Sequence, residues 1–73
     1  MRIEINYKSG TPAYLQIVEQ VQTAVASGRL RAGDQLPSIR ELAEQLRINR
    51  NTVARAYTEL EHRGVTATRH GLG

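Results

Sequence analysis

Arginine, asparagine and threonine stand next to one another, as Arg50, Asn51 and Thr52, at the start of the most polar helical segment of the chain. Arginine can donate to O6 and N7 of guanine, asparagine can pair with N6 and N7 of adenine, and threonine can contact a base through its hydroxyl or methyl group. Asn49 precedes them as a helix cap, and Arg55 follows one turn later on the exposed side. These residue types at this spacing indicate contact with duplex DNA. Thr52 lies toward the buried face, where a phosphate contact suits it better than a base contact.

A second set of candidate contacts opens the preceding helical segment. Ser38 and Glu41 have the spacing of a capping box, in which each side chain satisfies a backbone amide of the other residue. We expect Ser38 and Arg40 to contact DNA, and Arg40 to position the protein on phosphate more than to specify sequence. The plain alternative for Arg40 is a surface ion pair with Glu44, worth about 0.3–0.5 kcal/mol.

The end of the chain has the composition of a β-hairpin. Residues 65–69 favour a strand, and residues 70–73 favour a hairpin tip whose returning strand is missing from this chain. We expect Arg69 and His70 to reach the adjacent minor groove or its phosphates, and Gly71 to allow a close approach of the backbone. This incomplete hairpin is the expected wing.

The elements that must position these residues can also be predicted from the sequence. Thr11 followed by Pro12 predicts a helix start with Thr11 as the cap. Residues 2–8 alternate between apolar and polar types, which is typical of a half-buried strand or extended arm. The expected organisation is an arm at 1–10 and one domain at 11–73, with helices at about 12–27, 38–46 and 50–63, a turn at 47–49 and the incomplete wing at 65–73.

Apolar residues recur at helical spacing in each predicted helix and define one buried face. The third helix carries a polar stripe on the opposite side, formed by Asn51, Arg55, Thr58 and His62. The fold class expected is mainly α with a small β-hairpin wing, a winged helix-turn-helix with a three-helix core. The expected core faces are Tyr14, Ile17, Val18, Val21, Ala24 and Val25 in the first helix, Ile39, Leu42, Ala43 and Leu46 in the second, and Val53, Ala56, Tyr57 and Leu60 in the third.

Length and composition exclude several classes of protein. A domain of 73 residues leaves little core from which to form a substrate cavity, so no enzyme is expected. A net charge of +3 and an isoelectric point near 10.0 suit a partner that carries phosphate. There is no cysteine, and His62 and His70 have no partners at metal-ligand spacing, so neither a metal nor a cofactor is expected. Without an apolar run of about 20 residues or a signal peptide, we expect a soluble, cytoplasmic protein with no membrane contact.

Three motifs occur together in the chain: Leu36-Pro37-Ser38-x-Arg40-Glu41-Leu42-Ala43, Asn49-Arg50-Asn51-Thr52-Val53-x-Arg55-Ala56-Tyr57, and Gly64-Val65 followed by Arg69-His70-Gly71-x-Gly73. This combination resembles the winged helix-turn-helix domain of the GntR family of bacterial transcriptional regulators over roughly residues 11–73. The chain looks closest to the branch with a short helical tail, which often regulates transporter operons, and it also resembles the branch fused to an aminotransferase-like domain.

The resemblance implies a regulator, expected to be a repressor, that binds a palindromic double-stranded operator as a homodimer. It also implies a C-terminal effector or oligomerisation region, through which a small molecule would act, so the chain is either a DNA-binding fragment or an unusually short regulator. Other family members carry arginine at the position of Ala54, and no contact is assigned there. The family's contacts fall here on Arg40, Asn49, Arg50, Asn51, Thr52, His70 and Gly71.

Several alternatives stay open at this point. The polar stripe of the third helix could be a solvated face, or it could bind another protein, although its lack of aromatic and aliphatic anchors argues against a protein interface. A partitioning or architectural DNA-binding module would use the same fold. The chain could also be the N-terminal part of an aminotransferase-fused regulator that uses pyridoxal phosphate. Tyr14 and Tyr57 are expected in the core and not as platforms for base stacking.

Overall fold

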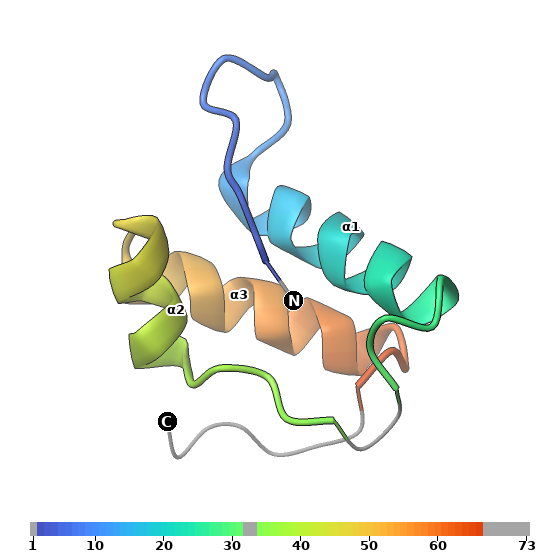
Figure 1. Cartoon of the computed structure of the whole chain (residues 1–73). Helices are drawn as coiled ribbons and strands as arrows, with labels where there is room; N and C mark the ends of the chain where they lie inside the picture. The colour runs from blue at the N-terminus through green and yellow to red at the C-terminus, as the bar shows by residue number, and fades with distance from the viewer. Residues whose placement is uncertain (1, 32–33, 67–73) are drawn as a thin grey trace.

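The computed structural model describes residues 2–31 and 34–66 of the chain. Within these residues the chain forms three helices, α1 (Ala13–Ala26), α2 (Ile39–Leu46) and α3 (Arg50–His62). Both α1 and α2 pack against α3, which makes α3 the central helix (Figure 1). The three-helix core that the sequence predicts is confirmed.

The core forms where the apolar stripes of α1 and α3 meet, with two residues of α2 closing one end. Fully burying a Val, Leu or Ile side chain contributes roughly 1.5–3 kcal/mol relative to leaving it exposed, so these stripes dominate the stability of the domain. Val25 was expected on the buried face but is 36% exposed, because successive helical residues point about 100° apart and Ala24 takes the core-facing position in the last turn of α1. The buried helical side chains are Ile17, Val18, Val21, Ala24, Leu42, Ala43, Val53, Ala56, Tyr57 and Leu60.

Local capping residues set where the helices begin. The Ser38 hydroxyl accepts from the Glu41 amide at 3.0 Å, and a Glu41 carboxylate oxygen accepts from the Ser38 amide at 3.0 Å, which completes the predicted capping box. Asn49 caps α3 through its side-chain oxygen, which accepts from the Asn51 amide at 2.7 Å. The prediction that Thr11 caps α1 was wrong. Pro12 occupies the cap position and α1 has no side-chain cap bond.

The turn between α2 and α3 depends on an unusual backbone conformation at Arg47. This residue adopts the left-handed region, with φ 56° and ψ 46°, and it ends α2. The Ile48 amide then donates to the carbonyl of Ala43 at 3.1 Å, which reverses the chain within a few residues. This reversal directs the start of α3 to the same end of the domain as α2.

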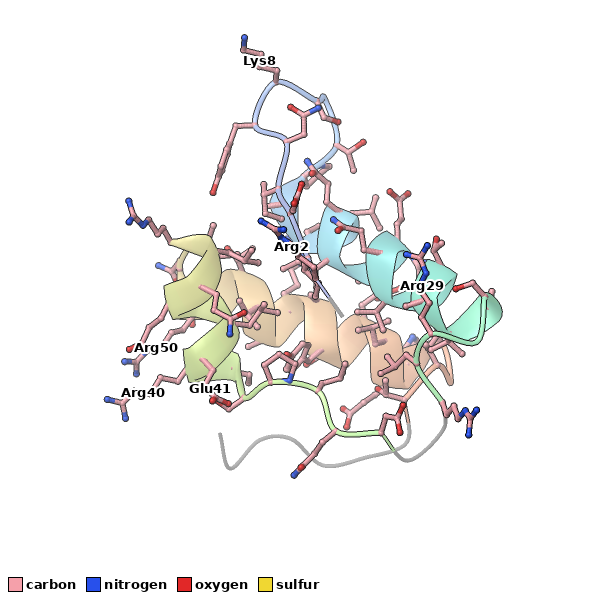
Figure 2. All side chains as sticks on the ribbon, viewed as in Figure 1. Arg2, Lys8, Arg29, Arg40, Glu41 and Arg50 are labelled. Carbon is pink, nitrogen blue, oxygen red and sulfur yellow. The ribbon has the colours of Figure 1, made fainter. Side chains whose placement is uncertain are left out.

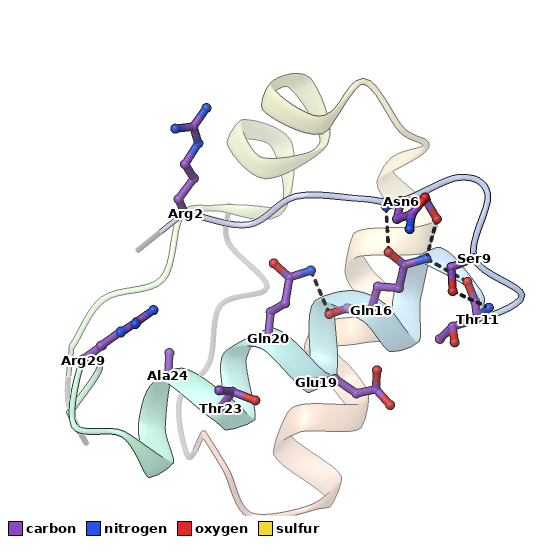
Figure 3. A pocket seen from close by; sticks show the side chains of 10 residues that line it. All are labelled: Arg2, Asn6, Ser9, Thr11, Gln16, Glu19, Gln20, Thr23, Ala24 and Arg29. Atoms are coloured by element: carbon purple, nitrogen blue, oxygen red, sulfur yellow. Dashed lines mark hydrogen bonds between the residues drawn. The ribbon is translucent and has the colours of Figure 1, made fainter.

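The N-terminal arm lies along α1 in extended form, held by glutamine side chains and not by a partner strand. Gln20 donates to the carbonyl of Glu4 at 2.6 Å and accepts from its amide at 3.0 Å. Gln16 makes the equivalent pair with Asn6 at 3.0 and 2.8 Å (Figure 3). Residues four apart on a helix are separated by about 6 Å along its axis, close to the spacing of alternate residues in an extended chain. The two glutamines therefore match two alternate residues of the arm.

The alternation predicted for the arm holds only near its beginning. Ile3 is buried and Ile5 packs against the core, but Tyr7 is 71% exposed and its hydroxyl donates to the Leu46 carbonyl at 3.3 Å. Residues 2–31 and 34–66 contain no strand. Most of the predicted strand at 65–69 and the whole predicted hairpin tip at 70–73 lie outside the described residues.

Candidate nucleic-acid interface

The first turns of α2 and α3 bring the predicted DNA contacts to one end of the domain. Arg40 and Arg50 project into solvent on the same side of the molecule, whereas Lys8 lies at the opposite end (Figure 2). The sharp turn at Arg47 contributes to this arrangement, because it joins the end of α2 directly to the start of α3. Two helices joined in this way allow the second to enter the major groove while the first contacts the backbone.

Arg50 and Asn51 are both exposed at the start of α3. Asn49 uses its side-chain oxygen as the cap, so its side-chain NH2 group remains available to donate to DNA. Thr52 is half-buried, in agreement with its expected place at the edge of the core face. Guanidinium and carboxamide groups on the first turn thus present the donors and acceptors that distinguish base pairs in the major groove.

Arg40 pairs weakly with Glu44 on the surface of α2. The separation is 3.8 Å and both side chains are 68% exposed, so solvent screens the pair strongly. A phosphate could replace this partner at little cost. Ser38, half-buried at the start of α2, uses its hydroxyl oxygen as the cap acceptor and keeps an O–H that can donate to a phosphate oxygen.

Arg55 is exposed, as are the other residues of the polar stripe, Asn51, Thr58 and His62. Its guanidinium carbon lies 4.0 Å from the centroid of the Tyr14 ring, which comes from the first turn of α1. Tyr14 is half-buried and packs against the core, as predicted. The sequence does not predict the contact between Tyr14 and Arg55, because no local signal reports how α1 crosses α3.

Tyr57 fixes the connector before α2 against α3. Its hydroxyl donates to the carbonyl of Pro37 at 2.6 Å, and its side chain is fully buried. Burial, and to a smaller extent the negative charge of Glu41, raise the pKa of Tyr57 to about 12. The hydroxyl therefore stays a neutral donor at physiological pH and holds the first turn of α2 beside α3.

The described residues also bear on a metal site, a small-molecule groove and a membrane-spanning helix. They contain no group of three His, Cys, Asp or Glu side chains placed to hold a metal ion. An open groove of about 460 Å³ runs between the arm and α1, but the Gln16 and Gln20 amides that line it are occupied by the arm (Figure 3). None of the three described helices combines the length and apolarity needed to cross a membrane. Arg69, His70 and Gly71 lie outside the described residues.

Comparison with known proteins decides the family. The model of the gntR family of bacterial regulatory proteins matches residues 13–73, which is most of the chain. The chain belongs to the gntR family. The HTH-type transcriptional repressor YtrA of Bacillus subtilis (strain 168) is 45% identical to it over 71 residues, which are 97% of this chain and 55% of the repressor. The HTH-type transcriptional repressor NagR of the same organism is 41% identical over 71 residues, 97% of this chain and 29% of NagR.

A solved structure supports the same assignment. YtrA from Sulfolobus acidocaldarius, a GntR-family transcription factor, superposes with a TM-score of 0.81 at 48% identity, covering 85% of this chain and 66% of that one. The chain spans about half the length of the Bacillus YtrA repressor. The family is one of bacterial regulatory proteins, the relatives are named as transcription regulators, and the region shared with them is the helix-turn-helix domain of this gntR-family chain.

Proposed function

We propose that this gntR-family domain binds one half-site of a palindromic operator, with the first turn of α3 in the major groove and the first turn of α2 on the flanking phosphates. The observation that carries the proposal is the exposure of Arg50 and Asn51 at the start of α3, on the side of the molecule where Arg40 also projects (Figure 2). Base-reading groups and a phosphate-binding cation are thereby available to the same stretch of duplex.

The roles of these side chains follow from their chemistry and position. Arg50 pairs with a guanine and Asn51 with an adenine, because their planar groups match the acceptor and donor patterns of those bases. Arg40, Ser38 and Thr52 bind phosphate and fix the register of the domain on the duplex. Asn49 adds an amide donor beside the same groove wall.

The assembled regulator is proposed to be a homodimer that represses transcription. Two copies with half-sites one helical turn apart would present their α3 helices about 34–36 Å from each other. Arg69, His70 and Gly71 are proposed to contact the adjacent minor groove as the wing. A small-molecule effector would act through a region outside this chain, by changing the distance or angle between the two copies.

The test begins with selection of bound duplexes from a random pool, followed by anisotropy titration of the selected duplex and of a random duplex. Arg50→Ala is expected to weaken binding to the selected duplex by about 1–3 kcal/mol and to relax the choice of one base pair. Arg40→Ala is expected to weaken both duplexes alike and to lower the slope of log K against log salt concentration by about 0.9.

Lys8→Ala is the matched control, because it removes one exposed cation at the opposite end of the molecule (Figure 2). Its affinity for the selected duplex is expected to equal that of the unmodified chain. The proposal fails if the selection enriches no sequence, or if Arg50→Ala binds the selected duplex as well as Lys8→Ala does.

A further inference from the structure

The stacking of Arg55 on Tyr14 links α3 to α1 at the edge of the candidate interface. The guanidinium carbon of Arg55 lies 4.0 Å from the centroid of the Tyr14 ring, a distance at which a cation is attracted to the face of an aromatic ring. Tyr14 is itself fixed, because it packs against the buried core. The ring therefore restrains a long, exposed side chain that would otherwise sample many rotamers.

Stacking leaves the hydrogen-bonding capacity of Arg55 available. The five N–H groups of a guanidinium lie in its plane and point away from a ring that covers its face. Glu59 follows Arg55 at i+4 and would be its natural partner, but the Glu59 carboxylate accepts instead from Arg63 at 2.6 Å. In the described part of the chain no carboxylate lies at salt-bridge distance from Arg55.

The direction of the contact distinguishes Arg55 from the base-reading residues. Asn51 lies at the start of α3, whereas Arg55 lies one turn later and reaches sideways to a residue of α1. Arg63, two turns further along, also reaches α1, where it donates to Gln22 at 3.1 Å. This side of α3 thus faces α1. If the start of α3 enters the groove, the Arg55 guanidinium lies beside the groove wall, where phosphates are found.

We propose that Arg55 is a phosphate clamp on the α1 side of α3, and that Tyr14 is the positioning residue that holds its guanidinium ready to donate to the DNA backbone. This inference rests on the proposed entry of α3 into the major groove. Ordering a long side chain at an interface costs binding energy, and a side chain that is already restrained avoids much of that cost. Tyr14 would therefore strengthen DNA binding without touching DNA.

The test compares four variants, Arg55→Ala, Arg55→Lys, Tyr14→Leu and Tyr14→Phe, on the selected and random duplexes over a range of salt concentrations. Arg55→Ala is expected to weaken both duplexes by the same factor and to lower the salt slope by about 0.9. Tyr14→Leu is expected to weaken both by about two- to tenfold with an unchanged salt slope, because the charge remains and only its ordering is lost. Tyr14→Phe keeps the ring and is expected to bind like the unmodified chain.

The double variant Tyr14→Leu/Arg55→Ala separates positioning from a general loss of structure. If Tyr14 acts through Arg55, the double variant binds as well as Arg55→Ala alone. If Tyr14→Leu does not fold, Arg55→Lys provides the second measurement. Lysine keeps the charge but lacks the planar guanidinium that stacks on a ring and can form two parallel hydrogen bonds to a phosphate. Arg55→Lys is expected to bind both duplexes more weakly with an unchanged salt slope.

Three results would overturn the inference. A smaller ratio of selected to random affinity in Arg55→Ala would make Arg55 a base contact. Losses from Tyr14→Leu and Arg55→Ala that add in full, or an affinity of Arg55→Lys equal to that of the unmodified chain, would remove the positioning role. Failure of the proposed entry of α3 into the major groove is recognised separately, because Arg50→Ala would then leave binding to the selected duplex unchanged.

Discussion

Replacing Arg47 with glycine is expected to stabilise the domain. Arg47 has φ 56° and ψ 46°, a left-handed conformation that costs an L-residue roughly 1–2 kcal/mol because its Cβ crowds the following carbonyl. Glycine avoids this cost but loses more backbone freedom on folding, which offsets roughly 0.5–1 kcal/mol. The net gain is on the order of 0.5–1 kcal/mol, which for a domain of this size raises the melting temperature by roughly 2–8 °C.

Circular dichroism during thermal and urea unfolding measures this effect, with Arg47→Ala as the matched control. Alanine also removes the exposed guanidinium but keeps a Cβ, so its stability is expected to stay within about 0.5 kcal/mol of that of the unmodified chain. An equal rise in melting temperature for Arg47→Ala would mean that the side chain and not the backbone carries the cost. An unchanged or lower melting temperature for Arg47→Gly would refute the argument from backbone strain.

Three further predictions concern the contacts that hold the helices and the arm. Ser38→Ala removes the cap of α2 and is expected to lower the free energy of unfolding by about 1 kcal/mol in urea titrations; an unchanged value would mean that the cap is dispensable. The pKa of Tyr57 is raised to about 12 in the folded chain, so above pH 10 the unfolded chain loses this proton first. The free energy of unfolding is therefore expected to keep its full value below pH 10 and to fall as pH rises from 10 to 12. Tyr57→Phe is expected to flatten the fall in stability over that range, and an equally steep fall would assign it to other groups. Gln20→Leu is expected to speed amide hydrogen exchange at Glu4 while leaving the amides of α1 protected, and unchanged exchange at Glu4 would show that the arm does not depend on Gln20.

The helices were predictable because local rules specify them. Ser38 and Asn49 are residue types that cap helices, and both do so in the structure. The buried face of α3 follows from helical periodicity alone. Thr11 shows the limit of such rules. Its residue type suits a cap, yet its carbonyl accepts from Gln16 at 2.8 Å and Pro12 takes the cap position, because the arm must turn there to run back along α1.

The features that sequence patterns did not predict depend on contacts between distant segments. The period-two pattern of the arm is equally consistent with a strand, and only the placement of Gln16 and Gln20 shows that side-chain amides bond its backbone. Arg55 was expected on the polar stripe as a DNA contact. Its stack on Tyr14 depends on the crossing of α1 and α3, which no local pattern encodes. The identities of the candidate contact residues could therefore be predicted from the sequence, whereas the contacts that hold their side chains in place could not.

Methylation interference on the selected operator tests the central claim most directly. Methylation of guanine at N7 blocks an acceptor that is reached only from the major groove. We expect methylation of one such guanine in each half-site to interfere with binding of the unmodified chain, and we expect Arg50→Ala no longer to distinguish methylated from unmethylated duplex at that position. Sequence-specific binding that tolerates N7 methylation at every guanine, or an identical interference pattern for Arg50→Ala, would contradict the placement of the first turn of α3 in the major groove.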